Sequence, residues 1–419
     1  MVGAEESGRL VTVGRRFEVV RNRPLLTLAV GHMTVDMYAG LLPMMYPLLA
    51  GKFALDLKTV GMVALAYGAG SSLSQPLFGW LADRHGTRYI GLALSWTAIT
   101  FALLGFVPNF AVLVALAALS GIGSGAYHPM GALNASAVIS EARRNSAMSI
   151  YTTGGTLGIA TGPLIGVLTL GAFGLHGTIF MLIPGLLIAV VLLFEMRAIA
   201  LRPRRTGGSP RLVPPPVPIG PISVVVGVMM LRAWSVFGLQ AFIPIWYASM
   251  GYEPSFYGLL ATTLVLANVI GAIGAGHLAD RFGRRILIVG STILSVPALL
   301  LFAQFPGSIA FVTAAAIGLL AASTTPLLLV TAQQLMVGRA GMASGLVLGL
   351  GFVMGAIGVP ILGAVGDAHG IQNAMRLLAL IAAASASVAA FLPSEELVRQ
   401  FANRNSNALP AASLPTASS

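Results

Sequence analysis

Long apolar segments fill most of this 419-residue chain and limit what it can fold into. Six of them lie in the first half, at about 25–50, 60–82, 89–107, 110–138, 146–170 and 176–196. Six more lie in the second half, at about 221–248, 256–279, 286–304, 308–330, 342–365 and 371–392. A helix needs about 20 apolar residues to cross a bilayer core about 30 Å thick. Because 56% of the residues are hydrophobic and only 9% are charged, we expect an all-α polytopic membrane protein with twelve transmembrane helices.

The two halves repeat each other at a constant offset of 197 residues, without a gap. Residues of the first half that coincide with identical residues of the second include Pro24, Pro47, Gly61, Pro129, Gly154 and Gly158. Two six-span units in the same orientation are typical of transporters that bind their substrate between the halves, near the midplane. We therefore predict two pseudo-symmetric six-helix bundles.

The polar stretches between and around these bundles set the predicted domain limits. They are an N-terminal tail at 1–24, bundles at 25–197 and 221–392, a Pro/Arg-rich linker at 198–220, and a C-terminal tail at 393–419. The last tail is rich in Ala, Ser and Asn, so we expect it to be disordered.

The distribution of basic residues predicts the orientation. If both termini share one side, 20 of the 24 Lys and Arg residues lie on that side, and only Lys52, Lys58 and Arg376 lie on the other. The positive-inside rule then places both termini in the cytosol. The net charge of +11 has no basic patch with interleaved aromatic residues, so we expect no nucleic-acid partner. We expect a monomer in the cytoplasmic (inner) membrane, with the lipid bilayer, a small-molecule substrate and protons as partners.

Several classes of chemistry lack their sequence motifs. The chain has no cysteine, and its only Gly-Lys pair, Gly51-Lys52, lacks the rest of a phosphate-binding loop. Neither His-Glu-x-x-His nor Gly-x-Ser-x-Gly occurs. We therefore expect no enzyme activity, no cofactor and no metal, with a proton gradient as the energy source.

A loop motif, Gly-x-Leu-Ala-Asp-Arg-x-Gly-x-Arg, follows the second span and recurs after the eighth. Its residues are Gly79, Asp83, Arg84, Gly86 and Arg88 in the first copy, and Gly276, Asp280, Arg281, Gly283 and Arg285 in the second. We expect the Asp and Arg side chains to lock the cytosolic ends of neighbouring helices and so to bias the conformational equilibrium. The alternative is that they only anchor short loops on the cytosolic side.

This duplicated motif resembles the loop signature of the major facilitator superfamily. More narrowly, the chain resembles the fosmidomycin-resistance family of efflux transporters, through His32-x-x-x-Asp36-x-Tyr38, Gln75-Pro76, Tyr127-His128-Pro129-x-Gly131 and Leu231-Arg232-Ala233. The resemblance implies the major facilitator fold and efflux. Met130 stands where that family usually has Glu, so a carboxylate expected to take part in proton coupling is missing. The substrate therefore stays open.

A glycine ladder runs through the fifth span. Gly154, Gly158, Gly162 and Gly166 recur every four residues on one helix face, and Pro163 lies among them. In the second half, the related positions are Gly355, Pro360 and Gly363. The ladder resembles an antiporter signature, which favours export, although ordinary packing of small residues is the alternative.

Few ionisable residues lie deep inside the spans: His32, Asp36, His128 and Arg232. Charges there are costly and functional by default. His32 and Asp36 share a helix face, and the resemblance implies that the first, fourth and seventh spans line one cavity. We therefore predict a single substrate and proton site, whose neighbours are Tyr38, Gln75, Tyr127 and Gln240. Two alternatives stay open: Asp36 and Arg232 form a static ion pair, and His128 only bonds a carbonyl freed by Pro129.

The expected function is alternating-access secondary transport, with proton-coupled efflux of a small drug or an anionic, fosmidomycin-like compound. One alternative is a proton symporter that imports an anionic metabolite through the same Asp and Arg residues. An alternative from another class is a membrane sensor that does not transport.

Overall fold

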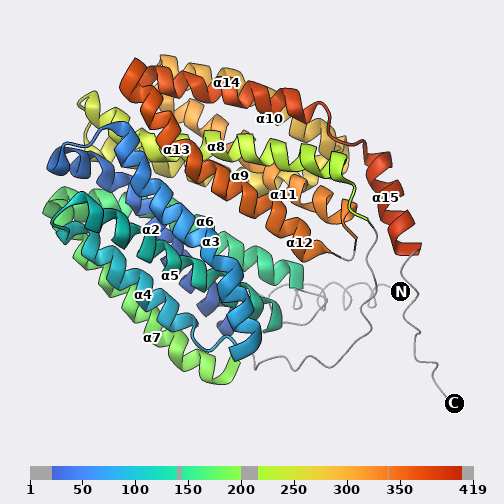
Figure 1. Cartoon of the computed structure of the whole chain (residues 1–419), viewed down its shortest axis with the longest axis horizontal. Helices are drawn as coiled ribbons and strands as arrows, with labels where there is room; N and C mark the ends of the chain where they lie inside the picture. The colour runs from blue at the N-terminus through green and yellow to red at the C-terminus, as the bar shows by residue number, and fades with distance from the viewer. Residues whose placement is uncertain (1–20, 139–143, 200–215, 338, 408–419) are drawn as a thin grey trace, which may run out of the picture.

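The computed structural model describes residues 21–138, 144–199, 216–337 and 339–407, and these residues form helices and no strand (Figure 1). The helices of the first half are α2 (Arg23–Phe53), α3 (Leu57–His85), α4 (Ile90–Leu103) with η1 (Leu104–Phe106), α5 (Phe110–Ala137), α6 (Arg144–Phe173), η3 (Gly174–Met181) and α7 (Leu182–Ile199). Those of the second half are α8 (Ile219–Ser249), α9 (Pro254–Phe282), α10 (Arg284–Gln304), α11 (Ile309–Leu335), α12 (Ala340–Ser344), η4 (Gly345–Gly349), α13 (Leu350–His369) and α14 (Ile371–Ala389).

These elements account for all twelve predicted spans. Nine helical runs in the described part of the chain are long and apolar enough to cross a membrane, and one of them, Ala147–Arg197, contains two predicted spans. The remaining two are α3 and the shorter apolar segment Ile90–Phe106. The prediction of an all-α polytopic membrane protein is confirmed.

Polar caps begin several of the spans. The side chains of Asn22, Asp56 and Asn109 accept hydrogen bonds from backbone nitrogens in the first turns of α2, α3 and α5. Such caps satisfy amide groups that have no partner within the helix. They fix the points at which these helices begin and therefore the height of each side chain along the bundle.

Helices α2–α7 lie on one side of the molecule and α8–α14 on the other (Figure 1). Within the first group, α6 packs against α2 through its glycines. A Cβ atom at Gly154 would lie 2.3 Å from the carbonyl oxygen of Ala29, and one at Gly158 would lie 2.1 Å from that of Met33. Only glycine permits backbones to approach this closely. The ladder thus presses α6 onto α2, the helix that carries His32 and Asp36.

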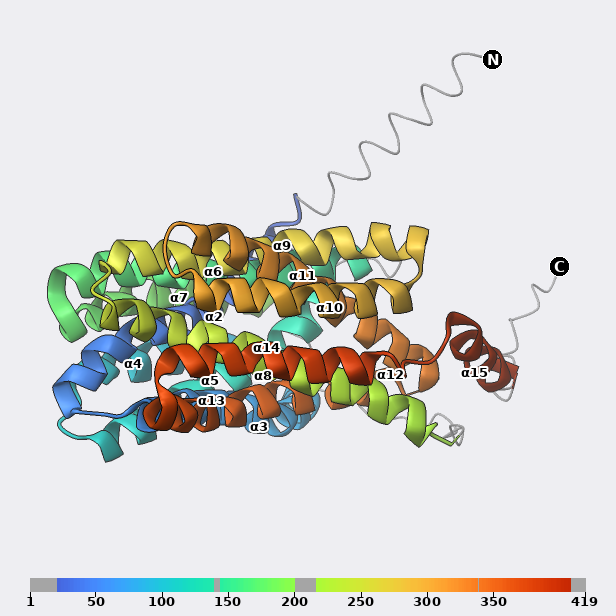
Figure 2. The same ribbon diagram turned by 90° about the horizontal axis from the view of Figure 1, so that it is seen from above.

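The two groups of helices contact each other mainly through two pairs of helices, α3 with α13 and α6 with α9. The contacts lie near the beginnings of α3 and α9 and toward the ends of α6 and α13. Figure 2 shows α3 beside α13. A Cβ at Gly363 of α13 would lie 2.4 Å from the carbonyl oxygen of Leu57. On the other pair, the Thr262 hydroxyl of α9 donates to the carbonyl oxygen of Ala160 of α6, at 2.9 Å. We call this end of the molecule, where α3 begins and α13 ends, the closed end.

The C-terminal tail differs from its prediction. Helix α15 (Glu395–Asn407) occupies part of the segment that composition predicted to be disordered. The hydroxyl of Ser394 caps it by accepting from the backbone nitrogen of Leu397, and Val398 is buried against the second bundle. Glu395 bonds both the backbone nitrogen and the guanidinium of Arg284. A cap, one apolar face and the Glu395–Arg284 contact hold this segment against the second bundle. Of the predicted tails at 1–24 and 393–419 and the linker at 198–220, residues 1–20, 408–419 and 200–215 lie outside the described residues.

Candidate functional site

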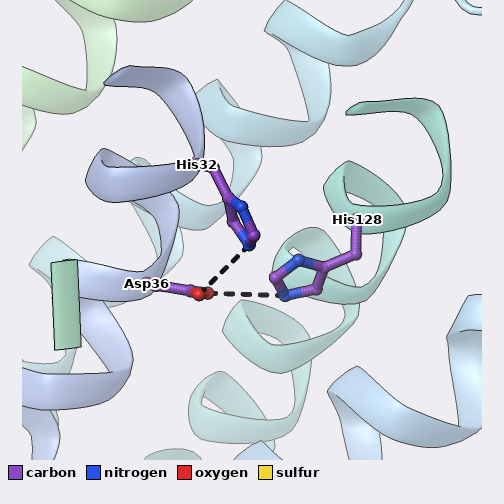
Figure 3. Close-up of side chains that lie close together, drawn as sticks. All are labelled: His32, Asp36 and His128. Carbon is purple, nitrogen blue, oxygen red and sulfur yellow. Dashed lines mark ion pairs between the residues drawn. The ribbon is translucent and has the colours of Figure 1, made fainter. Parts of the chain in front are cut away.

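The carboxylate of Asp36 lies between two imidazole rings (Figure 3). Its Oδ2 is 3.2 Å from Nε2 of His32, one turn earlier on α2, and its Oδ1 is 3.4 Å from Nε2 of His128 on α5. The side chains of His32 and Asp36 are 10% and 13% exposed, and that of His128 is 24% exposed. The histidine of α5 is therefore the member of this cluster that is most open to its surroundings.

The position of the His32 ring is fixed from α6. Its Nδ1 lies 2.8 Å from the backbone carbonyl oxygen of Tyr151, and the Tyr151 ring stacks on it with centroids 4.2 Å apart. A carbonyl oxygen only accepts hydrogen bonds, so Nδ1 carries a hydrogen. Nε2 is then the atom that faces Asp36, and its protonation decides how the pair interacts.

Three further residues complete the surroundings of the cluster. Nε2 of His128 lies 3.3 Å from the hydroxyl of Ser124, one turn earlier on α5. Tyr127 is buried, stacks on His32 and donates its hydroxyl hydrogen to the carbonyl oxygen of Leu28. A Cβ at Gly155 of α6 would lie 2.6 Å from Oδ2 of Asp36 and 2.6 Å from Nε2 of His32. A glycine at position 155 therefore leaves the space that the Asp36–His32 pair needs.

The same three side chains are the one group in the described part of the chain whose donors could hold a metal ion. Their ligand atoms all lie within 4.8 Å of one another. Two imidazoles and a carboxylate suit a transition metal, and a ring fixed through Nδ1 is a common feature of metal-binding histidines. No metal is predicted from the sequence, so a test of proton chemistry at these side chains needs a chelator control.

Arg232 does not join the cluster, so neither the predicted single site nor the alternative Asp36–Arg232 ion pair is formed. Its Nε donates to the carbonyl oxygen of Ala321 of α11 at 2.6 Å, inside the second bundle. The offset of 197 explains this, because it places Arg232 on Val35 and not on Asp36. One residue turns a helix by about 100°, which directs the arginine into its own bundle.

The other predicted neighbours are also dispersed. The hydroxyl of Tyr38 donates to the carbonyl oxygen of Met181, and its ring packs against Phe101 within the first bundle. Gln75 and Gln240 are half-buried and form no hydrogen bond with other described residues. Met130 is buried in the hydrophobic core, 6% exposed. Of the predicted site residues, only His32, Asp36, Tyr127 and His128 come together.

The loop motifs form no Asp–Arg lock among the described residues. Asp83 and Asp280 are exposed and have no ion pair there. Instead, Arg84 lies over the ring of Trp80, with its Cζ 4.5 Å from the ring centroid, and Arg285 donates to the carbonyl oxygen of Ala390. The glycines of the two loops have a clear role, since Gly86 and Gly283 end their helices with φ angles of 78° and 85°.

Sequence reasoning missed Ser124, Tyr151 and Gly155. Ser124 lies four residues before His128, so a search along the face of α5 finds it. Tyr151 acts partly through a backbone carbonyl, and Gly155 acts through the absence of a side chain. Neither of these roles leaves a signal in a single sequence.

The chain is similar to known membrane transporters over most of its length. The profile of the Major Facilitator Superfamily matches residues 28–253 and 225–416. The chain is 30% identical over 390 residues to the uncharacterized MFS-type transporter YfnC of Bacillus subtilis, covering 90% of this chain and 94% of that protein. It is 28% identical over 361 residues to the fosmidomycin resistance protein of Escherichia coli, covering 84% of this chain and 89% of that protein.

More distant relatives and solved structures agree with these matches. The multidrug resistance protein MdtG of Citrobacter koseri is 27% identical over 295 residues, covering 64% of this chain and 69% of that protein. A bacterial homologue of the human lysosomal transporter Spinster, solved in an inward-facing, unoccupied conformation, superimposes with a TM-score of 0.74. That match has 14% identity and covers 91% of this chain and 97% of the other. At this identity the likeness shows the fold alone.

Proposed function

We propose that this chain, which belongs to the Major Facilitator Superfamily, exports a small drug or an anionic compound in exchange for protons. The chain is an MFS transporter with efflux-type relatives, among them a fosmidomycin resistance protein and MdtG. Proton coupling, direction and substrate are the parts that we propose. The observation that carries the proposal is the carboxylate of Asp36 held between His32 and His128.

We infer that a proton lies in the Asp36–His32 contact. Because Nδ1 of His32 carries a hydrogen, a neutral His32 presents a lone pair from Nε2. A lone pair and an ionised carboxylate at 3.2 Å would repel each other, so one of the two groups holds an additional proton. The Asp36–His128 contact needs no additional proton, since a neutral His128 can donate from Nε2 to Asp36. The cluster in this conformation therefore corresponds to a proton-loaded state.

A proton site of this kind couples to conformational change if the protein holds the proton differently in its two states. His32 and Asp36 lie on α2 and are positioned by α6, whereas His128 lies on α5. A shift of α5 relative to α2 changes the distance between Asp36 and His128 and hence the stability of the charged carboxylate. Release of the proton on the cytosolic side would then accompany reloading with substrate.

The orientation that we propose places both termini in the cytosol and the closed end outside. Support comes from the basic residues of the described chain: Lys52, Lys58 and Arg376 lie at the closed end, and the loop arginines Arg84, Arg88, Arg281, Arg284 and Arg285 lie at the opposite end. This asymmetry follows the positive-inside rule for a cytoplasmic (inner) membrane. We propose that the transporter works there as a monomer.

Transport in inverted membrane vesicles with an imposed pH gradient tests the coupling. We expect a phosphonate such as fosmidomycin, or a lipophilic antimicrobial, to cause substrate-dependent proton release from the vesicles. Asp36→Asn should abolish that release while insertion stays normal, and the exposed control Glu253→Gln should behave as wild type. An unchanged pH dependence in Asp36→Asn would remove Asp36 from the mechanism.

Two controls separate the alternatives. If substrate and protons instead leave the vesicle lumen together, the chain imports its substrate by symport. A chelator should leave transport unchanged, and loss of transport on chelation would assign the three side chains to a metal ion.

A further inference from the structure

A second polar region lies inside the second bundle, away from the His32 cluster. A cavity of about 30 Å³ lies between α8, α10, α11 and α14. Its polar lining consists of Arg232, Ser235, Ser291, Thr292, Ser295, Thr324 and Ser385. All of its lining residues belong to the second half of the chain, so the site is separate from the one proposed for protons.

Arg232 lines this cavity, is half-buried, and forms few contacts with protein acceptors in the described part of the chain. Nε donates to the carbonyl oxygen of Ala321 at 2.6 Å, and Nη1 lies 3.8 Å from the sulfur of Met229. A guanidinium has five N–H groups, so several remain without a protein acceptor among the described residues. No carboxylate of the described chain forms an ion pair with Arg232. The positive charge is therefore uncompensated by the protein around it.

The hydroxyl groups around the cavity do not supply negative charge. Ser235, Ser291 and Thr324 each donate to carbonyl oxygens, as do the remaining Ser and Thr residues of the lining. A hydroxyl hydrogen can rotate away from such a bond toward a ligand. The site thus offers one permanent cation and several hydroxyl donors that can turn inward.

The first bundle has nothing comparable at the equivalent place. At the offset of 197, Arg232 corresponds to Val35 and Ser235 to Tyr38. Val35 and Tyr38 are both fully buried, at 0% exposure, and fill their bundle with side-chain atoms. The charged cavity is therefore a particular feature of the second half and does not follow from the duplicated architecture.

We infer that Arg232 binds a small inorganic anion, with chloride as the best fit. A guanidinium stays charged at any pH that a cell meets, and the half-buried Arg232 has no carboxylate partner among the described residues. A cavity needs about 10–15 Å³ to hold one water molecule, so this one holds about two waters or one monatomic anion. Bound chloride neutralises the arginine and stabilises the packing of α8 against α11.

The experiment compares the melting temperature of the purified full-length protein in chloride and in gluconate at equal ionic strength. A ligand that binds only the folded state raises the melting temperature as its concentration rises. We expect wild type to gain roughly 2 °C or more in 100 mM chloride. Arg232→Met should lose this dependence, and the exposed control Arg376→Gln should keep it. Identical melting curves of wild type in the two salts would overturn the proposal.

A second measurement covers the case in which Arg232→Met fails to fold. Crystals of wild type grown in bromide should show an anomalous peak beside the Arg232 guanidinium, between α8 and α11. Water alone at that position would overturn the proposal. Asp36→Asn should keep the chloride-dependent melting temperature, so failure of the proton mechanism and failure of the anion site are distinguishable.

Discussion

The carboxylate of Asp367, near the end of α13, accepts a hydrogen bond of 2.8 Å from the backbone nitrogen of Leu57, the first residue of α3. Its second oxygen accepts from the backbone nitrogen of Lys58, at 2.9 Å. A residue of the second half thus caps a helix of the first half, where the helix dipole favours negative charge. This contact joins the two bundles at the closed end.

Asp367→Asn should shift the protein toward opening of the closed end. Hydrogen bonds to a charged group contribute about 1.5–3 kcal/mol, and asparagine keeps part of them, so we expect a loss of roughly 1 kcal/mol. Because the chain has no cysteine, spin labels on Gly51→Cys and Ala368→Cys, both exposed, can report the distance across this end. Asp56→Asn is the matched control, since Asp56 caps α3 from within its own bundle. Equal distance distributions for wild type and Asp367→Asn would contradict the prediction.

Gly155→Ala should inactivate transport with little effect on insertion. The added Cβ would meet Oδ2 of Asp36 and Nε2 of His32, each at 2.6 Å, and would force the pair apart. We expect substrate-dependent proton release to fall to the level of Asp36→Asn. Gly171→Ala on the same helix is the control, because a Cβ there has nothing within 4 Å. Normal coupling in Gly155→Ala would show that the close Asp36–His32 contact is dispensable.

Gly158→Ala should lower the thermal stability of the protein, and its main effect should not be on proton coupling. Its Cβ would lie 2.1 Å from the carbonyl oxygen of Met33, which belongs to the backbone of α2. Overpacking of this kind costs about 1–3 kcal/mol because backbone atoms must shift. A thermal unfolding series in detergent should show a lower melting temperature than for Gly171→Ala. If the two variants melt alike, the ladder does not hold α6 against α2.

Docking of α15 should weaken in acid. Burial by itself raises the pKa of Glu395, but its hydrogen bonds with Arg284 outweigh burial and hold the pKa below the ordinary value. Because the folded pKa is lowered, the stabilisation is complete above the unfolded value of about 4.3 and is lost as the pH falls through the folded pKa. A spin label on Gln400→Cys should therefore become mobile only in that acidic range.

Two variants check that the docking depends on Glu395 itself. Glu395→Gln should release the label on α15 at neutral pH, because the charged partner of Arg284 is lost. Glu396→Gln changes the adjacent exposed carboxylate and should behave as wild type. Tight docking of α15 in Glu395→Gln would mean that the apolar contact of Val398 is sufficient.

The amino-acid sequence alone predicts the number and approximate limits of the spans, since membrane insertion requires apolar segments of a particular length. It also determined the duplication at 197 residues and, through four-residue spacing, the adjacency of His32 and Asp36. These features depend on local composition and helix geometry. They could be predicted because both act within one segment of the chain.

Which buried charges meet depends on how the helices pack in three dimensions. In a membrane helix, apolar residues surround a polar one on every side, so the sequence does not indicate the direction in which that polar residue points. His128 reaches Asp36 because α5 approaches α2, whereas Arg232 lies one position out of register with Asp36 in the repeat and enters its own bundle. The contributions of Tyr151 and Gly155 arise from a backbone carbonyl and a missing side chain, and both depend on how closely α6 packs against α2.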